Sequence, residues 1–185
     1  MNETTPVVPG LSLHNVRAVA FLRIATGVLF LIFGQYKVFG TQFTLHGGFQ
    51  IWINRFLADG SYPFMVPVLR SFVLPHATAI AFLVAYGELA IGVALISGIW
   101  VRPASAFGLL YMLALLFSSN YPGPQASLWQ YFGASLDHSV LALSFIAFLV
   151  GTPDAIWSVR TWRNSKQRRA HAAPAAIAKE ASSNP

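Results

Sequence analysis

The sequence contains no cysteine, and only 10% of its 185 residues are charged. Without cysteine the chain cannot form a disulfide, a thiolate metal site or a covalent c-type haem attachment. A typical soluble protein has about 25% charged residues, so this chain has too little charged surface to stay dispersed in water. Its hydrophobic fraction, by contrast, is 55%. This composition predicts an integral membrane protein.

Acidic residues are scarce as well, because six Asp and Glu stand against twelve Lys and Arg, for a net charge of +6. Half of the basic residues crowd the C-terminal end, at Arg160, Arg163, Lys166, Arg168, Arg169 and Lys179. A basic segment beside a hydrophobic one is typical of a cytoplasmic anchor that attracts anionic lipid headgroups. No nucleic-acid recognition motif accompanies it. We therefore expect the lipid bilayer, and not nucleic acid, as its partner.

Four stretches are apolar over about the 20 residues that a membrane-spanning helix needs. They run roughly from Val16 to Phe39, from His76 to Trp100, from Ala104 to Asn120 and from Phe132 to Thr152. Runs this long favour helices, because barrel strands are shorter and alternate in polarity. We expect an all-α fold, an integral membrane four-helix bundle over residues 16–157. A cytoplasmic N-terminal segment, 1–15, would precede it, and a basic, disordered cytoplasmic tail, 158–185, would follow.

Small residues recur at four-residue spacing within these stretches, as at Ala90, Ala94 and Gly98. This spacing is typical of closely packed membrane helices. With four spans, Arg17, Arg102 and the basic tail fall on the same side of the membrane. The positive-inside rule then predicts a multi-pass protein with both termini in the cytoplasm.

The connection between the first two spans, residues 40–75, is too apolar for a solvated loop. Five large apolar side chains recur there at helical spacing: Phe49, Trp52, Ile53, Phe56 and Leu57. This pattern predicts an amphipathic outer segment that lies on the bilayer surface or caps the bundle. Its role is either packing alone or that of a lid over a lateral ligand entrance.

Two charged residues fall well inside the predicted spans, Arg23 in the first and Glu88 in the second. A charge at the centre of a membrane helix is disfavoured by about 2.5–3.5 kcal/mol on insertion scales, so each needs a partner or a function. At 1.5 Å per residue, Arg23 lies about 10 Å and Glu88 about 18 Å from the cytoplasmic end. Because two long side chains can bridge that difference, we expect an Arg23–Glu88 pair.

Two interpretations of this pair are open. It is either a structural clamp between adjacent spans or a functional site. In the functional interpretation Arg23 and Glu88 are catalytic residues, and an incompletely paired Glu88 exchanges protons or holds a polar ligand.

Three further side chains are candidates for substrate binding. Lys37, near the outer end of the first span, either snorkels to the surface or attracts an anionic substrate. Tyr86 and Tyr111 lie inside spans and either pack in the core or hydrogen-bond the buried carboxylate or a quinone carbonyl. His76 and His138, at outer span ends, fit polar anchoring better than haem ligation, and no metal site is predicted.

An ordered set of residues runs through the first two spans and the turn that follows them: Arg23, Gly27, Gly34, Lys37, Glu88, Gly92, Gly98 and Arg102. With the stretches "LRIATGVLFLIFGQYKVFG" and "YGELAIGVALISGIWVRPASAFGLLYMLALLFSS", this set resembles the DoxX family of four-helix bacterial membrane proteins. The resemblance covers about residues 17–150. It implies a location in the bacterial inner membrane.

That family includes relatives of the membrane subunit of a thiosulfate:quinone oxidoreductase and members linked to oxidative-stress complexes. The resemblance therefore implies a quinone-linked membrane subunit of a small oxidoreductase, with thiosulfate or another reduced sulfur compound as donor and a quinone as electron acceptor. Glu88 would then exchange the protons that quinone chemistry needs. Its partner would be a soluble redox subunit or a second copy of the chain.

The alternative is a non-catalytic membrane scaffold that recruits a soluble redox or stress-response partner, so catalysis itself is an open question. A small-solute carrier is a third hypothesis, which the lack of a detectable inverted repeat in the sequence disfavours.

Overall fold

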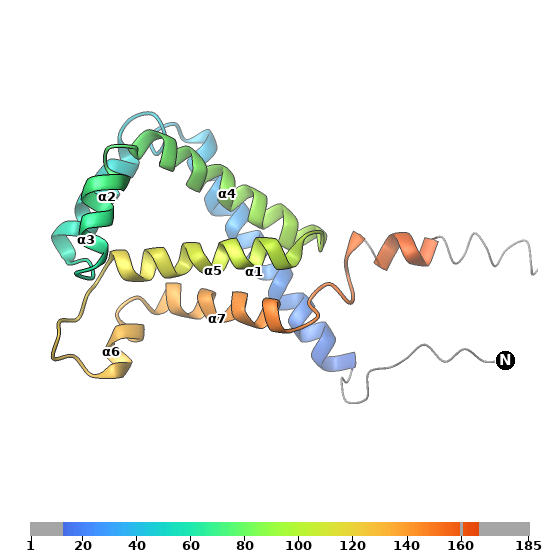
Figure 1. Ribbon diagram of the computed structural model, residues 1–185. Helices are drawn as coiled ribbons and strands as arrows, with labels where there is room; N and C mark the ends of the chain where they lie inside the picture. Colours follow the sequence, from blue (N-terminus) through green and yellow to red (C-terminus); the bar gives the residue numbers. More distant parts are fainter. Residues whose placement is uncertain (1–12, 160, 167–185) are drawn as a thin grey trace, which may run out of the picture.

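The computed structural model describes residues 13–159 and 161–166, and every regular element in this part of the chain is helical (Figure 1). The elements are α1 (Leu13–Phe39), α2 (Gly48–Asp59), α3 (Met65–Val68), the π-helical turn η1 (Leu69–Val73), α4 (Ala77–Ser97), α5 (Val101–Ser118), α6 (Leu128–Gly133) and α7 (Leu136–Val150). Most of the predicted N-terminal segment and of the predicted tail lies outside the described residues. Residues 161–166, near the start of that tail, are helical.

Three of the described helices are long and apolar enough to cross a membrane: α1 over Asn15–Phe39, α4 and α5. They coincide with the first three predicted spans. The fourth predicted span is not one continuous helix, because α6 ends at Gly133 and α7 begins at Leu136. Between them, the hydroxyl of Ser135 accepts a hydrogen bond from Asn120 at 3.0 Å. With its 15 residues, α7 is only about 22 Å long.

The long helices form two antiparallel pairs, with α1 packed along α4 and α5 packed along α7. The two pairs join where a short turn links α4 to α5, and from there these two helices diverge (Figure 1). At the open end α2 contacts α4, and α3 contacts α5. The result is a bundle whose two halves meet at one end and are bridged by short helices at the other.

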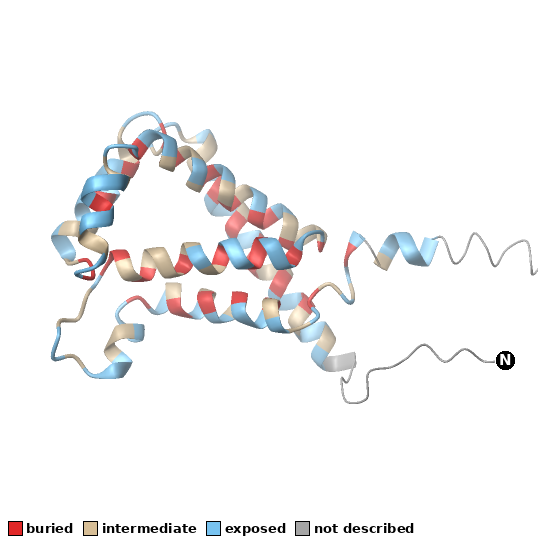
Figure 2. Cartoon of the chain, in the orientation of Figure 1, coloured by how far each residue is buried: buried red, intermediate tan, exposed pale blue. Residues whose placement is uncertain are grey.

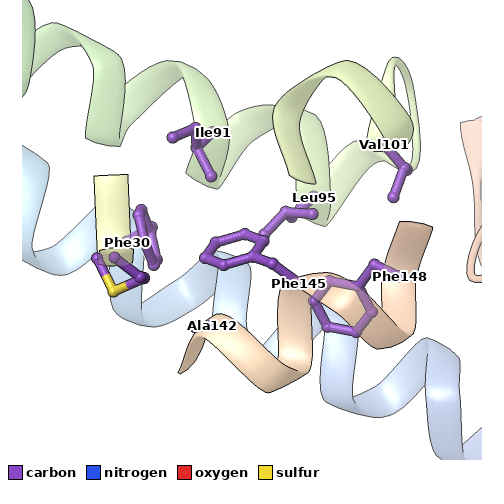
Figure 3. Packing of buried hydrophobic residues seen from close by; sticks show 8 residues of the cluster. Phe30, Ile91, Leu95, Val101, Ala142, Phe145 and Phe148 are labelled. Atoms are coloured by element: carbon purple, nitrogen blue, oxygen red, sulfur yellow. The ribbon is translucent and has the colours of Figure 1, made fainter. Parts of the chain in front are cut away.

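Aromatic rings hold the two halves together near the joined end (Figure 3). The fully buried ring of Phe145, on α7, meets that of Phe30, on α1, edge to face at 5.3 Å between centroids. Gly108, on α5, leaves room for Phe145, because a β-carbon at Gly108 would overlap that ring. Side chains of α4 and α5 complete this cluster, among them Leu95 and Met112. All four long elements therefore share one core.

Glycines let α1 and α4 approach until their backbones touch. A β-carbon at Gly92 would lie 2.8 Å from the Leu31 nitrogen, and one at Gly34 would lie 2.8 Å from the Leu89 nitrogen. Any larger residue would push the helices apart. These contacts fix the register, with residue 34 of α1 opposite residue 89 of α4.

The long helices have exposed outward faces (Figure 2), and large apolar side chains lie on them. Phe21 is 68% exposed, Leu83 72% and Leu143 65%, on α1, α4 and α7 respectively. Soluble monomers rarely carry apolar surfaces this extensive. Such faces fit contact with lipid tails.

The connection between α1 and α4 folds back onto the bundle. Phe49 and Ile53 of α2 are buried against Ala77 and Ala81 of α4, whereas Trp52 is half exposed. Pro67 does not interrupt the α3 helix, because it lies in the first turn, where the backbone amide has no partner within the helix. Whether α2 rests on the bilayer surface stays a prediction.

A buried tyrosine between α2 and α3 ties this connection to the other half of the protein. The hydroxyl of Tyr62 donates a hydrogen bond to the Tyr131 carbonyl at 3.0 Å. Burial raises the pKa of Tyr62 above its usual range, because a phenolate would lose its solvation. The phenol therefore remains a neutral donor.

Candidate functional site

Glu88 is buried in the middle of α4 and binds two side chains from other helices. Its Oε1 atom forms an ion pair with the ammonium of Lys37, on α1. The same oxygen accepts a hydrogen bond of 2.7 Å from the hydroxyl of Tyr111, on α5. The Lys37 nitrogen also lies 3.5 Å from that hydroxyl and 5.2 Å from the centre of the Phe43 ring. We call Lys37, Glu88 and Tyr111 the polar triad.

The register of α1 and α4 explains why Glu88 meets Lys37. Gly34 lies opposite Leu89, so the Cα atom of Lys37 is only about half a helical turn, roughly 3 Å, from the level of Glu88. Helical side chains tilt toward the N-terminus of their own helix. Because the two helices are antiparallel, Lys37 and Glu88 tilt toward each other.

The predicted Arg23–Glu88 pair is wrong. Arg23 is fully buried at the other end of α1, against Gly98, which is ten residues or about 15 Å along the chain from Glu88. Its Nη2 atom donates a 2.7 Å hydrogen bond to the Trp157 carbonyl, and Asp154 attracts its charge. The tilt of its side chain carries it away from Glu88. Arg23 thus fastens the segment after α7 to the joined end of the bundle.

This role for Arg23 predicts that its loss frees the segment around Trp157. The native chain has no cysteine, so a single Ser158→Cys substitution gives a clean reporter at a buried position. We expect Arg23→Met to speed maleimide labelling of that cysteine by about tenfold, the factor for losing one charge-assisted hydrogen bond. Arg17→Met, at an exposed arginine of the same helix, is the control. Equal labelling rates in all three proteins would contradict the role.

Of the three substrate-binding candidates from the sequence, two belong to the polar triad and one does not. Lys37 does not snorkel to the surface but points into the polar triad. Tyr111 binds Glu88, whereas Tyr86 is 55% exposed and stacks on Phe82, away from the triad.

His76 and His138 each lie close to a neighbouring residue of their own segment. His76 is 2.9 Å from the Phe72 carbonyl, and His138 lies beside Asp137. Among the described residues, no three His, Cys, Asp or Glu side chains are grouped to hold a metal ion.

A cavity of about 500 Å³ lies between α4 and α5, beside the polar triad. Glu88 and Tyr111 line it, together with Trp100, whose indole carries one N–H group. The other walls are apolar, with Leu83, Ile91, Ala94 and Phe107 among them. Trp100 is 80% exposed and Phe107 66% exposed, so the cavity borders the surface that faces lipid. Its size and lining suit a lipid-soluble molecule with a small polar head.

Phe107 and Trp100 were not among the residues that the sequence singled out for binding. Nothing in the sequence distinguishes them from the other aromatic residues of these apolar helices. The divergence of α4 and α5 alone places them on a cavity.

A comparison with known families gives one result. The sequence model of the DoxX family matches residues 18–120, which is more than half of the 185-residue chain. The match includes most of α1, all of α4 and α5, and all three members of the polar triad. No curated protein and no solved structure matches the chain.

Proposed function

The chain belongs to the DoxX family of membrane proteins, and from this premise we propose that it is the quinone-linked membrane subunit of a small oxidoreductase. One observation carries the proposal: a buried carboxylate and a phenol line an otherwise apolar cavity that borders the lipid-facing surface. Quinones partition into lipid, and they need a proton-exchanging group beside the ring. The cavity between α4 and α5 meets both requirements, because it borders the lipid-facing surface and is lined by a carboxylate and a phenol.

The proposed reaction takes two electrons and two protons to convert a quinone into a hydroquinone. A soluble redox subunit, which oxidises thiosulfate or another reduced sulfur compound, would supply the electrons. Glu88 and Tyr111, which both line the cavity, would relay the two protons to the ring oxygens, and each would take up a replacement proton that comes ultimately from water. We propose that Lys37 pairs with Glu88 rather than binding an anionic donor, because its charge is already taken up by that pair.

The proposed membrane arrangement follows the sequence. We propose that α6 and α7 together provide a fourth crossing of a bacterial inner membrane, in addition to α1, α4 and α5. Both termini would then lie in the cytoplasm, with Arg17 and the basic tail on that side. Lys37 would lie near the outer end of the bundle.

Filling the cavity tests the function. We expect Ala94→Phe to weaken binding of a short-chain ubiquinone analogue at least tenfold, because Ala94 lines the cavity and the new ring would fill part of it. Binding is measured by quenching of tryptophan fluorescence in lipid nanodiscs. Ala147→Phe, on the exposed face of α7, makes the same change away from the cavity and should leave binding unchanged. If the folded native protein binds no quinone, the scaffold alternative replaces this proposal.

A further inference from the structure

The hydrogen-bond donors of the polar triad all converge on one oxygen of Glu88. Both the Lys37 ammonium and the Tyr111 hydroxyl donate to Oε1. The second oxygen, Oε2, is buried and has no hydrogen-bond partner among the described residues. The carboxylate is therefore saturated on one side and unsatisfied on the other.

Apart from the indole N–H of Trp100, which is twelve residues from Glu88 along the chain, the polar groups that line the cavity are acceptors. An ionised carboxylate accepts hydrogen bonds and cannot donate them, and the one O–H group of Tyr111 already donates its hydrogen bond to Glu88. The remaining N–H groups of Lys37 are not available to a molecule in the cavity, because Lys37 is not among the residues that line it. A bound molecule must bring its own O–H or N–H group to satisfy Oε2.

The two redox forms of a quinone differ in this respect. The oxidised ring carries two carbonyl oxygens, which only accept, whereas the reduced ring carries two hydroxyl groups, which also donate. A quinone carbonyl facing Glu88 would place one hydrogen-bond acceptor against another. A hydroquinone hydroxyl would instead donate the hydrogen bond that Oε2 lacks. The Lys37–Glu88 pair is neutral as a whole, so an uncharged diol also suits the site.

Building on the proposed function, we propose that the cavity between α4 and α5 selects the hydroquinone over the quinone, with Glu88 Oε2 as the acceptor of a hydroxyl group of the reduced ring. Because Oε2 is buried, the carboxylate must turn about its terminal torsion to present this atom to the ligand, and such torsions are soft. The apolar wall formed by Ile91 and Phe107 contacts the ring faces of both forms equally. The hydroxyl groups alone make the difference.

Binding of matched ligands to the native protein in nanodiscs tests the selection. The probes are a short-chain ubiquinone analogue, its hydroquinone kept reduced under anaerobic conditions, and the dimethyl ether of that hydroquinone. We expect the hydroquinone to bind about tenfold more tightly than the quinone, the factor for one charge-assisted hydrogen bond. The dimethyl ether, which keeps the ring but has no O–H group, should bind no better than the quinone.

Variants assign the preference to the carboxylate. Glu88→Gln offers the cavity an N–H donor as well as an acceptor, so the ratio of quinone to hydroquinone dissociation constants should fall to about one. Tyr111→Phe keeps the carboxylate and should retain most of the preference. Tyr86→Phe removes the same hydroxyl from an exposed site on α4 and should change neither affinity.

The outcomes separate this inference from the function on which it rests. Equal binding of both redox forms, or tighter binding of the quinone, overturns the selection and leaves the quinone site in place. A dimethyl ether that binds as tightly as the hydroquinone also overturns it, and needs no variant to fold. If none of the three ligands binds, the proposed function fails as well.

Discussion

Replacing Lys37 with methionine is expected to lower the free energy of unfolding by about 3–5 kcal/mol, the usual cost of leaving a buried charge without its partner. Glu88 is only 5% exposed, and Lys37 supplies its counter-charge. Tyr111 donates one hydrogen bond but no positive charge. Unfolding in mixed detergent micelles, followed by circular dichroism, gives the free energy.

The double variant Lys37→Met, Glu88→Gln shows whether the loss is electrostatic. It removes both charges and keeps a side chain of the same shape at position 88, so most of the lost stability should return. Lys166→Met, at an exposed lysine, is the matched control and should change the free energy of unfolding by less than about 0.5 kcal/mol. If the single and double variants are equally unstable, packing of the lysine stem explains the loss instead.

Adding one methyl group to Gly92 should destabilise the protein by about 1–3 kcal/mol, the usual cost of overpacking a filled core. The β-carbon of Gly92→Ala would lie 2.8 Å from the Leu31 nitrogen and 2.9 Å from the Gly27 oxygen. Both atoms belong to the backbone of α1, so neither can rotate away. The two helices must separate, and the contact between Lys37 and Glu88 must lengthen with them.

Gly87→Ala makes the same change in the same helix with the opposite expected sign. A β-carbon at Gly87 has no atom within 4 Å. Because alanine is favoured over glycine inside a helix, we expect a gain of about 0.5–1 kcal/mol. The same micelle unfolding experiment compares both variants. A loss of similar size at both positions would mean that backbone contact between α1 and α4 does not limit stability.

The interrupted fourth span shows where hydrophobicity stops predicting helix boundaries. The run from Phe132 to Thr152 is apolar enough to predict one span, but hydropathy ignores the contacts of single polar side chains. Asn120, at the end of α5, binds the Ser135 hydroxyl, and the chain turns there between α6 and α7. That contact joins residues fifteen positions apart in the sequence, so no local sequence pattern predicts it.

The small residues of α4 show a second limit. The spacing of Ala90 and Ala94 predicts close helix packing, but Ala90 is exposed and both residues line the cavity. The close contact with α1 is made at Gly92 instead. The four-residue pattern identifies a helix with small residues, but it does not say which neighbour approaches which face.

Sequence alone determined the class of this protein, because a chain with so few charges and such long apolar runs can satisfy its backbone in lipid only as helices. It also identified Glu88 as a residue that needs a partner, since a buried carboxylate is costly wherever it lies. Only the tertiary structure decided that the partner is Lys37 and not Arg23. Depth along each helix was too coarse a measure, because the pairing depends on the register at Gly34 and Gly92 and on the tilt of side chains in antiparallel helices.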